Sequence, residues 1–280
     1  MRRRLALKNK KKWLAAPYGV WAVGFVIIPL IMILYYAFTS QENGTFTLVN
    51  FAEVFSANNM KALLLALLLA FVSTVICLVL AYPLAMILSS RSVSQTSFIV
   101  LIFILPMWMN FLLRTLAWQT LLEKNGVING ILSFLHLPNM SIINTPYAII
   151  LGMVYNFLPF MVLPIYNVLI KIDKDVVEAA RDLGANTFQT YSKILIPLSL
   201  PGIVSGITMV FIPALTTFVI SDLLGGSKIL LIGNVIEQEF KQTNNWNAGS
   251  ALSTVLMIFI LISMYFVNKY DKDGEGGAVF

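Results

Sequence analysis

The chain has 280 residues, of which 58% are hydrophobic and 11% charged, and its mean hydropathy is +0.82. A soluble domain carries about 25% charged residues, so this composition excludes an ordinary soluble protein and indicates a polytopic membrane protein. The net charge of +6 does not indicate nucleic-acid binding, because the basic residues cluster beside apolar runs. Cys77 is the single cysteine, which excludes an internal disulfide.

Six apolar runs predict six membrane-spanning helices, since a helix crosses the hydrocarbon core with about 20 residues and backbone groups must pair internally in lipid. The first run follows a basic, acid-free start and is too long for the core of a signal peptide. We therefore expect a basic N-terminus (1–16), a six-span domain (17–268) and a short tail (269–280). The predicted spans cover about 17–38, 62–88, 98–116, 145–169, 198–222 and 248–268.

The basic residues also predict the orientation of the chain. They are dense before the first span, between the fourth and fifth spans and in the tail, and sparser in the alternate connections. The positive-inside rule then places both termini, and the connection between spans four and five, in the cytoplasm.

That connection holds the longest charged, amphipathic segment of the chain. Its apolar and small residues fall near one face at helical spacing, and its charged residues largely on the other. A solvated surface helix is the plain interpretation, and a helix that docks on a partner protein is the functional one. The apolar and small residues are Val176, Val177, Ala180, Leu183, Gly184 and Phe188. The charged residues are Lys174, Asp175, Glu178, Arg181 and Asp182.

The order of residues in the segment favours docking on a partner protein. Glu178-Ala179-Ala180 is followed after three residues by Gly184, and then by Ile194 and Ile196-Pro197. This order closely resembles the EAA motif of ABC importer permeases, although that family usually has Leu where Ile196 stands. The resemblance implies an all-α type I permease fold whose coupling helix, here Glu178, Ala179, Ala180, Asp182 and Gly184, contacts a separate ATP-binding subunit.

Further stretches resemble the spermidine/putrescine (PotB-type) branch of these permeases. They are Leu158–Pro164, Ser221–Gly226 and Leu231–Ile236. The resemblance implies a bacterial cell-membrane complex with a second permease (PotC type), an ATP-binding subunit dimer (PotA type) and an extracellular polyamine-binding protein. ATP and Mg would then be bound by the ATPase, with no cofactor, metal or catalytic residue on this chain.

Polar and aromatic residues inside or at the ends of the spans are the candidates for a substrate path, because such groups usually face a protein interior or a pore. Interfacial anchoring is the alternative for the aromatic residues, and a solvated surface is the alternative for the acid. Prolines within the spans permit the broken helices that transporters use near their substrates. The candidates are Trp108, Asn110, Tyr155, Asn156 and Asp222.

Three other functions are weighed against a polyamine permease. An ion-driven secondary transporter usually needs titratable residues in mid-membrane, and the middles of the predicted spans hold no Asp or Glu. A permease for another solute remains open. An intramembrane hydrolase is disfavoured, because Gly202-Ile203-Val204-Ser205-Gly206 lacks the spacing of a nucleophile elbow and His136 falls in an outer loop. No phosphate-binding loop is present either.

Overall fold

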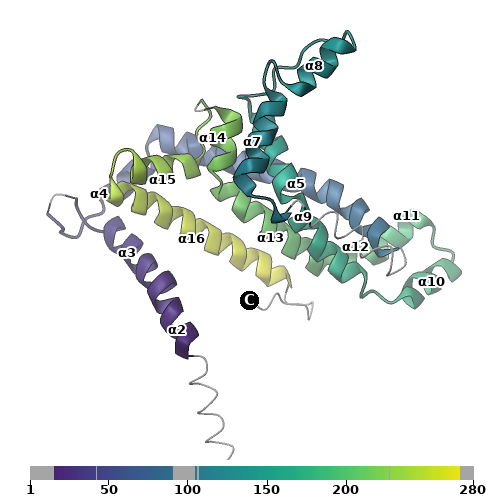
Figure 1. The fold of residues 1–280 in the computed structure, drawn as a ribbon. Helices are drawn as coiled ribbons and strands as arrows, with labels where there is room; N and C mark the ends of the chain where they lie inside the picture. Colours follow the sequence, from purple (N-terminus) through teal and green to yellow (C-terminus); the bar gives the residue numbers. More distant parts are fainter. Residues whose placement is uncertain (1–15, 42, 91–104, 106, 227, 272–280) are drawn as a thin grey trace, which may run out of the picture. The chain divides into compact units, whose positions relative to one another are not determined.

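The computed structural model describes residues 16–41, 43–90, 105, 107–226 and 228–271. These ranges are helical, apart from turns and an isolated antiparallel bridge between Thr39 and Phe46 (Figure 1). The elements are α2 (Ala16–Ala22), η1 (Val23–Ile27), α3 (Ile28–Ala37), α4 (Val49–Val54), α5 (Ala57–Ser89), α7 (Phe111–Leu122), α8 (Val127–Phe134), α9 (Pro146–Leu169), α10 (Lys174–Asp182), α11 (Thr187–Thr190), η2 (Tyr191–Leu195), α12 (Ile196–Leu198), α13 (Leu200–Thr216), α14 (Val219–Gly225), α15 (Ile232–Lys241) and α16 (Trp246–Asp271).

Four helices within the described ranges are long and apolar enough to cross a bilayer, and a bent pair makes a fifth if it counts as one span. Their positions confirm helices at the predicted first, second, fourth and sixth spans. The predicted third span, 98–116, lies largely outside the described residues, so the count of six stays a prediction. The four helices are Pro17–Ala37, Ala57–Ser89, Pro146–Leu169 and Trp246–Tyr265.

The fifth predicted span, 198–222, is not one straight helix. The chain bends by 66° between Thr187–Leu198 and Leu200–Thr216. Thr217 is then extended (φ −66°, ψ 138°), so α13 ends and α14 begins separately at Val219. The hydropathy pattern did not predict these breaks, because both flanking helices are apolar.

Prolines explain the two π-helical turns. Pro29 follows η1 and Pro197 follows η2, and each proline removes a helical N–H and crowds the preceding turn. The chain widens at both places, so that Ile28 N–H reaches the carbonyl of Val23 and Ile196 N–H reaches that of Tyr191. Such wide turns relieve a proline without ending the helix.

The contacts divide the chain into two units, of which the smaller combines residues 1–59 and 236–259. Among the described residues of this unit, the side chains of Asn50 and Asn247 satisfy carbonyls at the end of α3. Asn50 Nδ2 donates to Ala37 O at 3.0 Å, and Asn247 Nδ2 donates to Tyr36 O at 3.0 Å. Helix ends leave such carbonyls unpaired, so these amides fix the C-terminal end of the first span.

The larger unit, residues 60–235 and 260–280, has its core on α9. Helix α13 lies along α9 (Figure 1), and two glycines of α13 permit the close approach. A β-carbon at Gly202 would lie 2.8 Å from Pro164 O, and one at Gly206 would lie 2.7 Å from Met161 Sδ. This is the Gly-x3-Gly packing common between membrane helices. Helix α5 covers another side of α9, where Cys77 is fully buried.

Candidate functional site

The charged segment predicted to couple to an ATPase forms a capped helix, α10. The Asp173 carboxylate accepts the N–H of Asp175 at 3.1 Å, which caps the N-terminal end. At the other end Gly184 has φ +83°, its N–H reaches Arg181 O at 2.9 Å, and the N–H of Ala185 reaches Ala180 O at 3.0 Å. These two bonds form a Schellman motif, which needs a left-handed residue that glycine adopts without strain.

The helix is shorter than the apolar spacing predicted. Leu183 and Gly184 lie beyond the end of α10 at Asp182, and Phe188 belongs to α11. Reading all of them on one helical face was therefore wrong, because the Gly184 cap turns the chain. The small size of Gly184 is also not used within the chain, since a β-carbon there would meet nothing within 4 Å.

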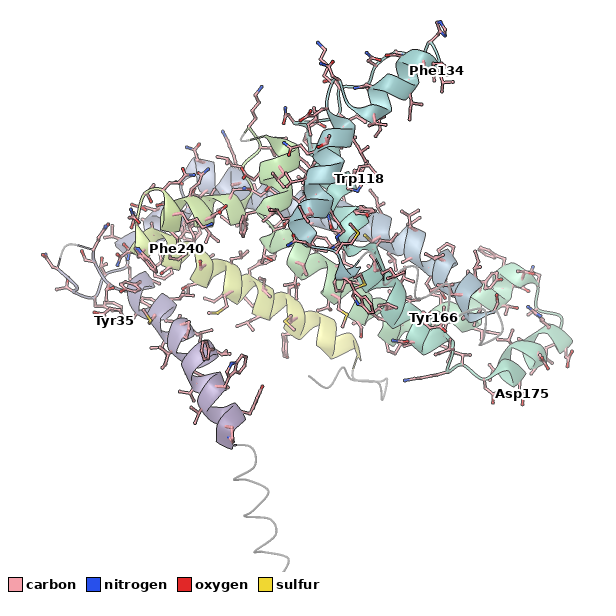
Figure 2. All side chains as sticks on the ribbon, in the orientation of Figure 1. Tyr35, Trp118, Phe134, Tyr166, Asp175 and Phe240 are labelled. Carbon is pink, nitrogen blue, oxygen red and sulfur yellow. The ribbon has the colours of Figure 1, made fainter. Side chains whose placement is uncertain are left out.

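The segment presents apolar side chains that the described residues of the chain do not cover. Leu183 is 90% exposed, Phe188 77% and Val176 44%. Glu178, Ala179, Asp182 and Gly184 are exposed beside them, and Ala180 is half-buried. Adjacent exposed apolar groups on a charged segment are characteristic of a protein contact. Figure 2 places Asp175 of α10 and Phe134 of α8 at opposite ends of the larger unit.

The structure does not gather the five predicted path residues into one site. Trp108 is 76% exposed. Asn110 caps the start of α7, where its Oδ1 accepts the N–H of Leu112 at 2.8 Å, so this amide has a structural role. Asp222 is exposed on α14.

Tyr155 and Asn156 are neighbours on α9 but differ in surroundings. The Tyr155 ring meets Trp118 of α7 edge-on, with centroids 5.3 Å apart. The two rings and Tyr147 line an open, largely apolar hollow of about 430 Å³ between α5, α7 and α9. Asn156 is 1% exposed and donates to Gly152 O at 2.9 Å, while its Oδ1 accepts no hydrogen bond from the described residues. A buried acceptor without a donor costs free energy, which makes Asn156 the most unusual of the five.

A buried asparagine that sequence reasoning missed holds α14 in place. Asn234 Nδ2 donates to Phe218 O at 3.1 Å, and its Oδ1 accepts from Leu231 N–H at 3.1 Å and from the Ser221 hydroxyl. Gly233 beside it permits contact with the helix break, because a β-carbon there would lie 2.8 Å from Thr216 O. The sequence singled out the stretches Ser221–Gly226 and Leu231–Ile236 for their resemblance to PotB-type permeases, and the tertiary contacts show that Asn234 joins the two.

The sequence is similar to that of known permeases over most of its length. Residues 13–270 match the family described as binding-protein-dependent transport system inner membrane component. The spermidine/putrescine transport system permease protein PotB of Haemophilus influenzae is 38% identical over 260 residues, which are 89% of this chain and 91% of that protein. PotB of Escherichia coli K12 is 39% identical over 245 residues, with 85% and 89% covered.

Solved structures agree on the fold. A chain of a bacterial ABC transporter for import of the acidic polysaccharide alginate superposes with a TM-score of 0.80 and 20% identity, covering 97% of this chain and 99% of that one. A second structure of an alginate ABC transporter, in complex with a pentasaccharide-bound periplasmic protein, superposes with a TM-score of 0.79 and 18% sequence identity. The predicted ABC importer permease fold is confirmed, and the chain belongs to the family of binding-protein-dependent transport system inner membrane components.

Proposed function

We propose that this chain is the membrane-spanning permease subunit of an ATP-driven importer of polyamines such as spermidine and putrescine. The observation that carries the proposal is the 38–40% identity, over at least 85% of the chain, to permeases named for spermidine/putrescine transport. The fold by itself does not select the cargo, because structures with the same fold belong to importers of an acidic polysaccharide.

The α10 segment supports coupling to a separate ATPase. Its exposed Leu183 and the nearby exposed Phe188, with the charged side chains around them, provide a mixed apolar and polar surface. ATP binding would move two such segments toward each other, one from this chain and one from a second permease. The permease pair then alternates between inward-open and outward-open states, and the partners supply the shift because they bind the two states with different affinities.

Recognition of the polyamine cation would use hydrogen-bond acceptors and the faces of aromatic rings. The Trp118–Tyr155 pair offers ring faces on which an ammonium group can rest by cation–π attraction. The exposed Asp222 carboxylate would raise the local concentration of polyamine, and Asn156 Oδ1 is an acceptor to which no group in the described part of the chain donates. An extracellular binding protein would deliver the polyamine, as a periplasmic protein is bound in the alginate importer complex.

A secondary transporter is the second candidate that the sequence left open. The spans within the described residues, Pro17–Ala37, Ala57–Ser89, Pro146–Leu169 and Trp246–Tyr265, contain no Asp or Glu. An ion-coupled carrier usually needs such groups for its relay. The family match makes the ATP-driven mechanism the better supported one.

The proposal is tested by the ATPase activity of the purified complex in lipid nanodiscs. We expect the spermidine-loaded binding protein to raise ATP hydrolysis well above the rate with the unloaded protein. Binding protein offered with alginate oligosaccharide serves as the control and should give the unloaded rate. Equal rates under all three conditions would contradict the proposed cargo.

A further inference from the structure

The bend that joins the α10–α11 segment to α13 has a local cause and a defined position. Pro197 and Pro201 stand four residues apart and remove two helical N–H donors within one turn. The chain turns by 66° between them, at Ser199, whose φ of −93° and ψ of 2° leave the helical region. We call this position the Ser199 bend.

A hydrogen bond from another span holds the Ser199 bend. Ser199 is fully buried, and its Oγ lies 3.1 Å from Ile196 O and 3.0 Å from Tyr82 Oη of α5. A hydroxyl carries one proton. The arrangement in which Ser199 donates to the Ile196 carbonyl and Tyr82 donates to Ser199 uses each proton once. The bond joins residues 117 positions apart in the sequence.

The bend therefore has a π-helical side and a closely packed side. Toward α10 the chain passes through the π-helical turn η2 (Tyr191–Leu195), a distortion of the α-helix that is frequent at functional sites. Toward α13 it is fixed, because Gly202 packs directly on the backbone of α9 at Pro164. Tyr82 forms its hydrogen bond to Ser199, where these two sides of the bend meet.

We propose that Tyr82 is a positioning residue that keeps the Ser199 bend at one angle, so that movement of the α10–α11 segment is transmitted to α13. The proposal rests on the coupling function of α10 proposed above. Without the Tyr82 bond the bend opens and closes independently, and some of each ATP-driven movement is lost at the hinge. The ATPase then still turns over, but fewer substrates cross for each ATP hydrolysed.

The first test removes only the phenol oxygen. We expect Tyr82→Phe to lower polyamine uptake per ATP hydrolysed about 2- to 10-fold, the range for one net hydrogen bond, while stimulated ATPase activity stays near that of the wild type. Ser199→Ala should have the same effect, and the double variant should be no worse than either one.

Tyr166→Phe is the matched control, because it removes a phenol oxygen from α9 that makes no side-chain hydrogen bond within the described residues. Its uptake per ATP should equal that of the wild type. A parallel loss of uptake and ATPase activity in Tyr82→Phe, or additive effects of the two substitutions at the bend, would overturn the proposal.

A second test needs no substrate and so separates the hinge from the cargo. Spin labels at Lys193→Cys and Met209→Cys, both at exposed positions on either side of the bend, report its angle in a Cys77→Ala background of the assembled complex. We expect a narrow distance distribution with Tyr82 present and a broad one with Tyr82→Phe. Identical distributions would refute the hinge even if spermidine is transported, whereas absence of spermidine uptake with a broadened distribution would refute only the cargo.

Discussion

Substitution of Gly184 separates two roles that this residue has in the α10 segment. The backbone role is the left-handed cap, φ +83°, and most residues with a β-carbon adopt that conformation at a cost of about 1–2 kcal/mol. The surface role is the space left for a partner, since nothing of this chain lies within 4 Å of a β-carbon there. Three substitutions, Gly184→Asn, Gly184→Ala and Gly184→Trp, therefore have different expected effects.

Gly184→Asn tests the backbone role at its mildest, because asparagine tolerates the left-handed region better than most residues. We expect near-normal uptake. Gly184→Ala meets the strain but adds little volume, and we expect a partial loss, because about 1–2 kcal/mol corresponds to a 5- to 30-fold shift in the cap equilibrium. Gly184→Trp adds the same strain and an indole that nothing in this chain accommodates, so uptake should be abolished.

The assay is radiolabelled spermidine uptake, with co-purification of the ATPase subunit and membrane content measured for each variant. We expect Gly184→Trp to reach the membrane in normal amount and to lose the ATPase, while Gly184→Ala keeps most of it. Normal ATPase binding by Gly184→Trp would refute the docking surface. Equal losses in Gly184→Ala and Gly184→Trp would show that only the cap matters.

Three further substitutions test the packing and the path. Gly202→Ala should destabilise the complex by about 1–3 kcal/mol, because its β-carbon would lie 2.8 Å from the backbone oxygen of Pro164. Gly19→Ala in α2 meets nothing within 4 Å and should not lower the melting temperature, since alanine favours a helix more than glycine does; a similar result for both substitutions would contradict the packing. Asn234→Leu removes three hydrogen bonds, among them the one that Leu231 N–H makes to the amide oxygen, and should cost about 1–3 kcal/mol; an unchanged thermal transition would argue against its role in holding α14. Asp222→Asn should raise the KM for polyamine and leave the maximal rate nearly unchanged, and identical uptake kinetics would exclude the carboxylate from the entry path.

The helical nature of the spans was predictable because a lipid environment leaves few choices. An apolar run of sufficient length must be a helix, and the positions of the runs at Pro17–Ala37 and Pro146–Leu169 were found within a few residues. The start of the charged segment was also predictable, since Asp173 is a favourable cap residue.

The breaks and contacts were not predictable, because they depend on residues far apart in sequence. Proline content indicated kinks, yet Pro83 lies inside an unbroken α5 while Pro197 and Pro201 flank a bend of 66°. The difference follows from the neighbours: two prolines within one turn remove more backbone bonds than one. Tyr82 carried no signal at all, because its partner is 117 residues away.

The candidate path was predicted less well than the fold. Polarity alone selected both Asn110 and Asn156. The structure uses Asn110 as a helix cap, whereas Asn156 keeps a buried acceptor that receives no hydrogen bond within the described residues. A polar residue in a span can cap a helix or leave a buried acceptor unpaired. A single sequence does not distinguish the two, because it does not show the contacts.

The central claim is that this chain moves polyamines across the membrane at the expense of ATP. Its most direct test is uptake of radiolabelled spermidine into proteoliposomes that contain the complete complex, with the binding protein on one side and ATP available to the ATPase on the other. We expect saturable uptake that requires both the binding protein and ATP and that persists when ionophores dissipate all ion gradients. Uptake that continues without ATP and collapses with the ionophores would contradict the claim.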